Sequence, residues 1–465
     1  MNTLSQNIYN HCPSILQTLL LNGYALKIHR ERYGKKFEAV MEEMGKNEWM
    51  SYEDLLDYQN EKLRPLVKHA YETVPYYRKV MDERKIKPSE INNVDDLQKL
   101  PVLTREDVKK HFEKLISRSF RKRDLIPGHT SGTTGSPLEF FWDQKTCVYN
   151  NAADWRQKNW AGLNYGERYA VLLGRMIVPR KVESPPFWRM NYLHNQLWLS
   201  SFHLSEKNMA KYVKKLEDYK AKALEAYPST AFILAKYLEA QKKTIPLRAV
   251  LTSSEPLLTI QRETIEKSFE CKVFDFYGMA ERVIFAGECD KHEGLHLNMD
   301  YGITEILDER NEPVERGRMG WVVGTSLHNY AMPFIRYKTS DVSSIRRGKC
   351  ACGRGFPLMS DVTTKAEDIV VTRDGRFISP SVLTHPFKPL HNIKMSQIIQ
   401  EDLDLIRIKI VKGKDYTERD TETLLHSFKE RVGLQMKVEI EFVDSLERMS
   451  SGKFKWVLSK VPLKI

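Results

Sequence analysis

A run of small and hydroxyl residues, Ser131-Gly132-Thr133-Thr134-Gly135-Ser136-Pro137, follows His129-Thr130 in the chain. Its glycines allow a flexible loop whose backbone N–H groups can close around a polyphosphate, and its hydroxyls can add hydrogen bonds. The same composition is common in surface turns, so the run alone does not decide between the two. It is not a Walker loop, because no Lys-Ser or Lys-Thr pair follows the second glycine. No Gly-x-Ser-x-Gly elbow surrounds Ser131, which disfavours a catalytic serine.

Three later segments place charged side chains where loops are expected. In Asp275-Phe276-Tyr277-Gly278-Met279-Ala280-Glu281 an apolar run ends before a carboxylate, and Glu281 is a candidate ligand for Mg²⁺, which prefers oxygen. Asp341 is suited to accept both hydroxyls of a ribose, and Arg336 to face a phosphate. Lys453 follows Ser450-Ser451-Gly452, on a loop able to enter another domain's cleft. Taken singly, each has an ordinary alternative: a capping carboxylate, a surface ion pair or a solvated lysine.

Cysteine and histidine residues form a separate pattern. Cys350 and Cys352 place two thiolates within reach of one ion, and Cys289 with His292 or His296 offers two more ligands. A Cys3His set is suited to a tetrahedral structural zinc site, with His296 favoured over His292. The alternative is a group of small buried cysteines. A zinc ion here would pin the loop after Glu281 to the loop after Asp341.

Length and composition limit the classes of protein. A chain of 465 residues exceeds one compact core and predicts two or three domains. The net charge of +12 is compatible with an anionic nucleotide, nucleic acid or an acidic membrane face. The basic residues are dispersed among acids without a basic stripe carrying interleaved aromatics, which argues against nucleic acid. Six cysteines are too few for a disulfide scaffold.

No apolar run reaches the roughly 18 residues that a membrane span requires, and the apolar stretch at 15–21 lacks the features of a secretory signal. A cytoplasmic location is therefore expected. The stretch at 15–21 is predicted to be a helix packed on its own domain, and peripheral contact with a membrane surface stays open.

Hydrophobic periodicity predicts an α/β fold. Residues 1–110 are expected to be helical, with one helix over 53–70 containing Pro65 and another beginning at Arg105 behind the N-cap Thr104. Strands are expected at 138–141, 169–173, 249–251 and 273–276, with helices at 209–217, 231–241 and 260–269. This alternation predicts a mainly parallel sheet with ligands bound beyond its strand ends. A β-rich stretch is expected over 302–345.

The predicted domains are a helical N-terminal region at 1–110, a core at 111–367 and a small α+β domain at 368–465. Strands at 406–411 and 438–443 with a helix at 422–432 would form the core of that last domain.

In this order and spacing, the four segments resemble the motifs of the adenylate-forming superfamily of acyl-CoA synthetases and adenylation domains. The loop matches Ser-Gly-Thr-Thr-Gly-x-Pro, and 277–281 match Tyr-Gly-x-Thr/Ser-Glu with Ala280 in place of the hydroxyl residue. Asp341 corresponds to the ribose-binding Asp and Lys453 to the Lys of the C-terminal Ser-Gly-Lys motif. The chain is most similar to the branch of phenylacetate-CoA ligase and coenzyme F390 synthetase, especially to CapK-like capsular-polysaccharide proteins. That similarity reaches His69-Ala70-Tyr71-Glu72-Thr73-Val74-Pro75.

The resemblance implies a large N-terminal domain with mainly parallel sheets and a small mobile C-terminal domain. It implies Lys453, Glu281 and Thr130 as catalytic residues, with Glu281 holding Mg²⁺. Asp368 aligns with the hinge Asp, and Thr364-Lys365 replaces the usual Gly-Arg, which leaves the ribose contact of that Arg in doubt. Together with Arg336, the implied ATP-binding residues are Thr130, Ser131, Gly132, Thr133, Thr134, Gly135, Ser253, Ser254, Glu255, Pro256, Asp275, Phe276, Tyr277, Gly278, Met279, Ala280, Asp341 and Lys365.

The implied activity is that of an AMP-forming ligase, which joins a small carboxylic acid to AMP with ATP·Mg²⁺ and passes the acyl group to an acceptor, foremost the thiol of CoA. One alternative is transfer to an amine or hydroxyl in surface-polysaccharide biosynthesis. Another is a non-catalytic scaffold that keeps the fold, which the presence of Glu281, Asp341 and Lys453 disfavours. The sequence identifies neither the acid nor the oligomeric state.

Overall fold

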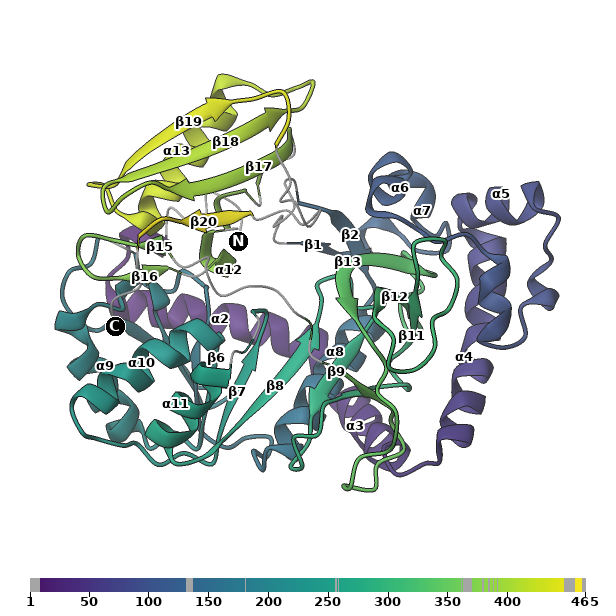
Figure 1. The fold of residues 1–465 in the computed structure, drawn as a ribbon, viewed down its shortest axis with the longest axis horizontal. Helices are drawn as coiled ribbons and strands as arrows, with labels where there is room; N and C mark the ends of the chain where they lie inside the picture. Colours follow the sequence, from purple (N-terminus) through teal and green to yellow (C-terminus); the bar gives the residue numbers. More distant parts are fainter. Residues whose placement is uncertain are drawn as a thin grey trace.

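The structure of the protein is a computed structural model (Figure 1). It describes residues 9–130, 137–179, 181–255, 257, 259–360, 362, 370–378, 380–383, 385–387, 389–390, 392–446 and 456–461.

The N-terminal region is helical, as predicted. The predicted helix at 53–70 is α4, which begins behind the N-cap Ser51 and continues through Pro65. Thr104 is confirmed as the N-cap of α6, because its hydroxyl accepts a hydrogen bond from the Asp107 N–H at 3.1 Å. The helices of this region are α2 (Ser14–Arg32), α3 (Lys35–Asn47), α4 (Tyr52–Thr73), α5 (Pro75–Glu83), α6 (Arg105–Lys110) and α7 (Phe112–Leu115).

A nine-stranded sheet forms the centre of the large unit, with the order β14-β10-β9-β8-β7-β6-β3-β5-β4. Strands β5, β3, β6, β7 and β8 are mutually parallel, and the remaining pairs are antiparallel. The strands are β3 (Tyr169–Leu172), β4 (Trp188–Asn191), β5 (Gln196–Leu199), β6 (Ala223–Ala226), β7 (Ala249–Ser253), β8 (Lys272–Gly278), β9 (Phe285–Glu288), β10 (Leu295–Leu297) and β14 (Leu358–Met359).

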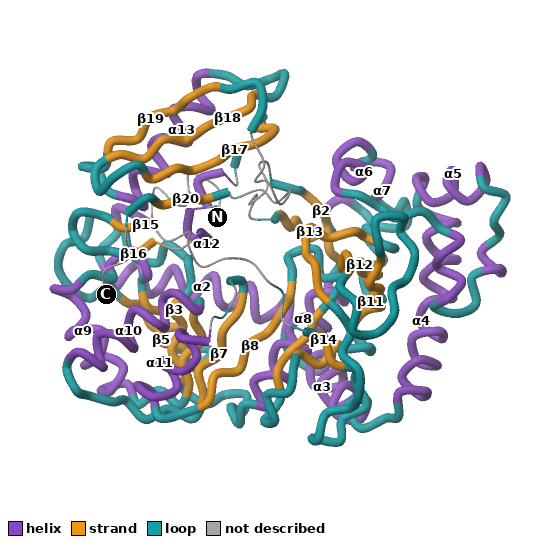
Figure 2. Tube along the Cα trace, viewed as in Figure 1, coloured by secondary structure: helices purple, strands orange, loops and turns teal. Residues whose placement is uncertain are grey.

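Helices cover this sheet, as Figure 2 shows. They are α8 (Gln144–Trp160), α9 (Glu206–Tyr219), α10 (Pro228–Ala240) and α11 (Thr259–Phe269). Helix α10 joins β6 to β7 and α11 joins β7 to β8, so the carboxyl ends of these strands share one edge of the sheet.

Two smaller sheets complete the large unit. The hairpin of β1 (Ile126–His129) and β2 (Glu139–Trp142) brackets the glycine-rich loop. An antiparallel sheet of β11 (Gly302–Leu307), β12 (Gly320–Ser326) and β13 (Tyr337–Ser343) forms the β-rich stretch that the sequence predicts.

The C-terminal unit has an α+β core, as predicted, and lies above the large sheet in Figure 1. Its four-stranded sheet has the order β19-β18-β17-β20, and Phe387, Phe428 and Trp456 pack in its core. That core also includes Phe202 and Tyr227 of the large unit. The predicted boundary at 365–368 falls outside the described residues. The elements are β15 (Val370–Val371), β16 (Phe377–Ile378), α12 (Pro380–Leu383), β17 (Ile393–Gln400), β18 (Leu405–Lys412), α13 (Glu418–Val432), β19 (Lys437–Phe442) and β20 (Val457–Ser459).

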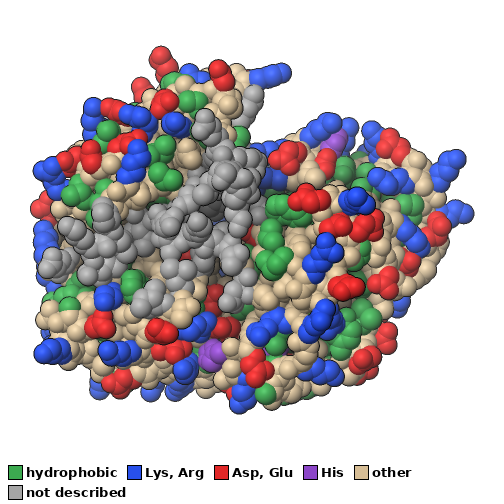
Figure 3. Space-filling model, viewed as in Figure 1, with side chains coloured by type: hydrophobic (Ala, Val, Ile, Leu, Met, Phe, Trp, Pro, Cys, Tyr) green, Lys and Arg blue, Asp and Glu red, His purple; other side chains and the backbone are tan. Residues whose placement is uncertain are grey.

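Basic and acidic side chains are mixed over the face of the molecule drawn in Figure 3. That distribution agrees with the dispersed charges of the sequence. None of the helices in the described part of the chain combines the length and apolar character needed to cross a membrane.

Candidate functional site

The carboxyl ends of β6, β7 and β8 bring several predicted binding segments together. The Thr252 hydroxyl of β7 donates to the Asp275 carboxylate of β8 at 2.6 Å. The backbone N–H of Ser229, in the first turn of α10, donates to Glu255 Oε2 at 3.1 Å, which ties the loop after β6 to the loop after β7. The ring of Phe276 stacks on Phe285, with centroids 5.0 Å apart. The segments around Ser253–Glu255 and Asp275–Phe276, which are predicted to bind ATP, therefore lie at one edge of the sheet.

Two largely buried carboxylates, Glu281 and Asp341, lie beside this edge. The hydroxyl of Tyr277 donates to Asp341 Oδ2 at 2.7 Å, and the hydroxyl of Tyr337 donates to Glu281 Oε1 at 2.9 Å. Burial raises the pKa of Glu281 above its usual value, and the Tyr337 hydroxyl opposes that shift. Burial also raises the pKa of Asp341, opposed by Tyr277. The negative charge of Asp341 adds a smaller contribution that also raises the pKa of Glu281, so a nearby cation would stabilise the ionised form of Glu281.

The glycine-rich loop is anchored to the same network by Arg105. Leu103 pairs with β13 through hydrogen bonds to Arg336 and Lys338, which places the start of α6 beside Tyr337. Arg105 Nη2 then donates to the Thr130 hydroxyl at 3.2 Å, and its positive charge lowers the pKa of Glu281. Thr130 closes the base of the loop, since its N–H donates to the Leu138 carbonyl and its hydroxyl accepts from the Leu138 N–H, both at 2.9 Å.

The structure thus brings together the residues predicted for phosphate, metal and ribose: Thr130, Glu281 and Asp341 belong to one network. Several other predicted residues cannot be placed in it. The predicted residues that lie outside the described part of the chain are Ser131, Gly132, Thr133, Thr134, Gly135, Pro256, Lys365, Asp368 and Lys453.

Arg336 is placed differently from its prediction. Its guanidinium does not turn toward the carboxylate network: it pairs with Glu305 at 2.9 Å and donates to the Leu100 carbonyl at 2.7 Å. The side chain is 3% exposed. Arg336 lies just before β13, with a backbone φ of 53°, and its partner Glu305 belongs to β11. Arg336 therefore stabilises the fold.

Sequence reasoning missed Arg105 and Tyr337. Tyr337 begins β13 four residues before Asp341, but the pairing of β13 with β12 is irregular between Lys338 and Val342, so a simple period of two does not mark Tyr337. No local pattern marks Arg105, which looks like an ordinary first residue of a capped helix. Only the pairing of Leu103 with β13 brings it to the site.

Arg282, next to Glu281, is a buried cation that the sequence analysis also passed over. It is 6% exposed, its guanidinium lies 3.6 Å from the centre of the Trp142 ring, and Nη1 donates to Cys147 Sγ at 2.9 Å. Burial lowers the pKa of this guanidinium. A Cβ on Gly128 would lie 2.6 Å from Trp142, so glycine is needed there for the ring to reach Arg282. The stack joins the hairpin β1–β2 to the segment of Glu281.

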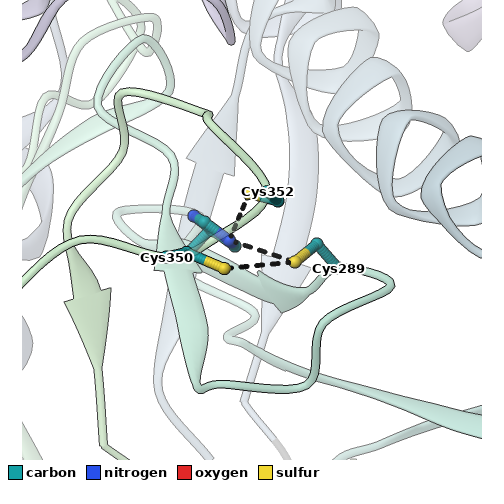
Figure 4. A group of neighbouring side chains, drawn as sticks. Cys289, Cys350 and Cys352 are labelled. Carbon is teal, nitrogen blue, oxygen red and sulfur yellow. Dashed lines mark hydrogen bonds between the residues drawn. The ribbon is translucent and has the colours of Figure 1, made fainter.

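The four predicted zinc ligands, Cys289, His296, Cys350 and Cys352, converge on one point, and the labelled cysteines are drawn in Figure 4. The sulfur atoms of Cys289 and Cys350 are 3.7 Å apart, and His296 Nε2 lies 3.3 Å from Cys289 Sγ and 3.5 Å from Cys352 Sγ. A tetrahedral zinc with bonds of about 2.3 Å to sulfur and 2.0–2.1 Å to nitrogen separates its ligand atoms by about 3.5–3.8 Å. The donor set and its spacing fit zinc.

The surroundings of this cluster support metal ligation. His296 Nδ1 lies 3.4 Å from the Phe356 carbonyl, which favours a proton on Nδ1 and leaves Nε2 toward the sulfurs. Burial lowers the pKa of His296 to about 4, so the ring is neutral at neutral pH. His292 instead pairs with Glu288 at 3.4 Å, outside the cluster.

Known proteins show similarity over nearly the whole chain. Protein CapK of Staphylococcus aureus is 24% identical over 98% of this chain and 99% of its own length. The phenylacetate-coenzyme A ligase of Thermus thermophilus is 24% identical over 88% of this chain and 98% of its own, and that of Escherichia coli is 24% identical over 87% and 95%. Residues 370–460 match the CapK C-terminal domain family.

Among solved structures, 2-hydroxyisobutyryl-CoA ligase in the postadenylation state covers 90% of this chain and 92% of its own, with a TM-score of 0.57 and 19% identity. Its structure in the thioesterification state gives a TM-score of 0.56 at 20% identity, over 89% and 91%. The chain has the adenylate-forming fold. The predicted α/β architecture and the predicted resemblance to CapK and the phenylacetate-CoA ligases are both confirmed.

The assignment of Arg336 to the fold predicts a specific loss of stability. Arg336→Met leaves the Glu305 carboxylate buried without its partner, and should lower the free energy of unfolding by about 3–5 kcal/mol. The double variant Arg336→Met with Glu305→Leu removes both charges and should recover most of that loss. Urea unfolding measures the stabilities, and ATP affinity of the folded protein should stay unchanged. A stable Arg336→Met protein with weakened ATP binding would contradict this assignment and would support the predicted contact between Arg336 and a phosphate.

Proposed function

We propose that this protein is an AMP-forming ligase that activates a small carboxylic acid with ATP·Mg²⁺ in the cytoplasm and transfers the acyl group to the thiol of CoA. The observation that carries the proposal is the single network that joins Thr130, Glu281 and Asp341. Those residues come from the three sequence motifs expected to hold phosphate, metal and ribose. The named ligases among the relatives support the same class of reaction.

The chemistry explains why such a site must supply positive charge. A carboxylate is a poor acyl donor because oxide would have to leave. Attack of the carboxylate oxygen on the α-phosphate of ATP releases pyrophosphate and gives an acyl-adenylate, from which AMP leaves readily when a thiol attacks the carbonyl. Two anions must approach each other in the first step, so the site has to stabilise the extra negative charge.

Each proposed role follows from where the side chain lies. Asp341, held by Tyr277, accepts the hydroxyls of the ribose, and Glu281 is the residue that would hold Mg²⁺, which neutralises phosphate charge when bound. Thr130 and Arg105 hold the base of the phosphate loop. We propose that Lys453 neutralises the charge of the α-phosphate and of the incoming carboxylate. Asp368 would be the hinge residue, and Lys365 would make a further contact to the nucleotide.

The acid would bind between the loops after β6, β7 and β8. Tyr227 follows β6, and Ser253 and Phe276 belong to the carboxyl-terminal ends of β7 and β8. The hydrogen bond from Ser229 to Glu255 holds the loops after β6 and β7 together. The mixture of aromatic and hydroxyl side chains fits a small acid with both apolar and polar parts.

A second acceptor class has its own support. The match to CapK covers 98% of this chain, against 88% for the phenylacetate-CoA ligase of Thermus thermophilus, and the C-terminal unit matches the CapK C-terminal domain family. The alternative is therefore transfer of the activated acyl group to an amine or hydroxyl of a surface-polysaccharide precursor, giving an amide or ester.

We also propose that Cys289, His296, Cys350 and Cys352 bind one structural zinc ion. The fit of their ligand atoms to a tetrahedron supports this, as does the orientation of His296 by a carbonyl. Zinc would fix the turn between β9 and β10 to the loop before β14, and the cluster lies apart from the proposed reacting groups.

The ligase proposal predicts acid-dependent exchange between ATP and pyrophosphate. In a screen of carboxylic acids, an accepted acid should support the exchange, and Lys453→Ala should lower its rate at least about a hundredfold because charge stabilisation is lost. The same variant should still pass the acyl group from a ready-made acyl-adenylate. Lys460→Ala is the matched control, since Lys460 pairs with Glu401 on the surface.

Product analysis with CoA, amino acids and amino sugars as competing acceptors separates the thiol from the amine or hydroxyl alternative. Full exchange activity in Lys453→Ala would remove the role given to that lysine. If no acid in the screen supports exchange between ATP and pyrophosphate, the result favours the alternative of a non-catalytic scaffold protein.

The raised pKa of Glu281 predicts a pH dependence. Because the folded protein binds this proton more tightly than the unfolded chain, its stability without nucleotide should fall as the pH rises through the raised pKa. Affinity for Mg²⁺ should change in the opposite sense and weaken as the pH falls through that pKa. Tyr337→Phe removes a hydrogen bond to the ionised carboxylate, so the acid limb of the exchange reaction should move to higher pH. Tyr219→Phe, a change near the surface, should leave the profile in place. If the acid limb of the pH profile does not move in Tyr337→Phe, Glu281 is not the group that titrates in that limb.

The zinc proposal predicts about one zinc ion per chain in purified protein. Cys352→Ser should lose the metal and lower the unfolding temperature, because three ligands hold zinc much less tightly than four. Acid-dependent exchange should persist in the fraction that is folded at low temperature. Cys12→Ser alters a cysteine outside the cluster and serves as the control. Metal-free wild-type protein with unchanged stability would refute a structural zinc.

A further inference from the structure

Helix α2 contacts the rest of the protein along a narrow stripe. Gln17, Leu21 and Ala25 are its buried residues, and Leu21 packs against Ile177 and Val178. Gln17 accepts a hydrogen bond from Arg189 at 3.0 Å, which fixes the helix to β4. The prediction of a helix packed on its own domain therefore holds for one side of α2.

The opposite side of α2 is apolar and exposed to solvent. An α-helix turns about 100° per residue, so Leu16, Leu19 and Leu26 lie within about 100° of Ile15 and away from the buried stripe. Ile15 is 77% exposed and Leu19 is 62% exposed. A helix that is apolar on both sides is normally buried on both sides. The outer side of α2 thus lacks a covering among the described residues.

A neighbouring turn enlarges this apolar area. Asn22 Nδ2 donates to the Met190 carbonyl at 2.8 Å, and the N–H of Tyr192 donates to Asn22 Oδ1 at 2.9 Å, so the turn between β4 and β5 lies against α2. Tyr192 and Leu193 are 68% and 43% exposed. Of the fourteen large apolar side chains exposed in the described part of the chain, eight lie here: Ile15, Leu16, Leu19, Leu20, Tyr24, Leu26, Tyr192 and Leu193. We call this group the α2 surface.

The charged side chains of α2 itself are mostly positive. Residues 1–30 contain no Asp or Glu, although the chain has 61 acidic residues in 465. Lys27 and Arg30 follow the apolar turns on the outer side of the helix, and the Lys27 side chain is 71% exposed. Glu31, the one acid of α2, lies 3.8 Å from Lys27.

We propose that the α2 surface binds the face of an anionic lipid bilayer, with α2 lying in the plane of the interface. Leucines and an isoleucine would enter the acyl boundary, while Tyr24 and Tyr192 lie at headgroup depth and Lys27 and Arg30 meet lipid phosphates. No described helix can span a bilayer, so the binding is peripheral. This inference does not depend on the proposed reaction.

The charges favour a bilayer over a second copy of the chain. A two-fold contact of the α2 surface with itself would bring the same positive groups of both copies to one interface with few acids to pair them. An anionic bilayer instead supplies the missing negative charge together with an apolar phase.

Flotation of the full chain with vesicles tests the proposal. The wild-type protein should float with vesicles of phosphatidylcholine containing about one third phosphatidylglycerol, and much less with phosphatidylcholine alone. Leu16→Ser with Leu19→Ser should weaken binding at least about tenfold, since two apolar side chains no longer enter the lipid. Lys27→Gln with Arg30→Gln should weaken binding about tenfold on the anionic vesicles. Leu434→Ser is the matched control, because Leu434 is 84% exposed and lies in the C-terminal unit.

All variants should keep the unfolding temperature of the wild type, because the altered side chains are exposed. The proposal is overturned if the wild-type protein floats with neither vesicle, or if the leucine variant floats as well as Leu434→Ser. It is also overturned if the leucine variant turns a dimer into a monomer on gel filtration and leaves flotation unchanged, because the α2 surface would then be an interface between copies.

Discussion

The carboxylates of Glu281 and Asp341 are buried in one network, where each accepts a hydrogen bond from a tyrosine hydroxyl. A tyrosine hydroxyl carries no charge, so it orients a carboxylate and compensates only part of the cost of burying it. Arg105 supplies positive charge to this network. Burial raises the pKa of both acids, and these partners oppose only part of that shift. The proposed magnesium nucleotide would bring a divalent cation and ribose hydroxyls to these two acids.

The architecture of the large unit brings Glu281, Asp341 and their partners together from different elements. Parallel strands β6, β7 and β8 present their carboxyl ends at one edge, where Ser253 and Tyr277 lie. The acid of β13 approaches from a different sheet, and the hydrogen bond from Tyr277 to Asp341 joins the two sheets at the site. Leu103 and Arg105 connect the helical N-terminal region to β13 and to the base of the glycine-rich loop. The two larger sheets, the hairpin β1–β2 and the helical N-terminal region thus each contribute a residue to these contacts.

Local sequence patterns predicted the strands and helix ends that are determined by a few neighbouring residues. Apolar runs identified β7 and β8, and the cap Thr104 identified the start of α6, because strand burial and helix capping are decided within a few residues. The short β6 escaped prediction, since its sequence Ala-Leu-Glu-Ala has little preference for a strand and is fixed by neighbours on both sides.

For the site, motif spacing predicted Glu281, Asp341 and the four cluster residues. It could not assign Arg336, because its partner Glu305 comes from β11 and is brought to it only by the tertiary fold. Arg105 could not be found at all, since its position depends on a bridge between Leu103 and Tyr337, far apart in the sequence. Residues whose role is set by strand register or by distant pairing remain outside the reach of sequence patterns.

The cysteine cluster constrains the same two segments at their far ends. Cys289 follows Glu281 through β9, and Cys350 follows Asp341 through the end of β13, so both segments leave the site and meet again at the cluster. One connection near the carboxylates, from Tyr277 to Asp341, and a second at the thiolates leave these segments little freedom to separate. The cluster can thus contribute to the proposed nucleotide binding by limiting the movement of both segments, although its ligand atoms belong to a different set of residues from the proposed reacting groups.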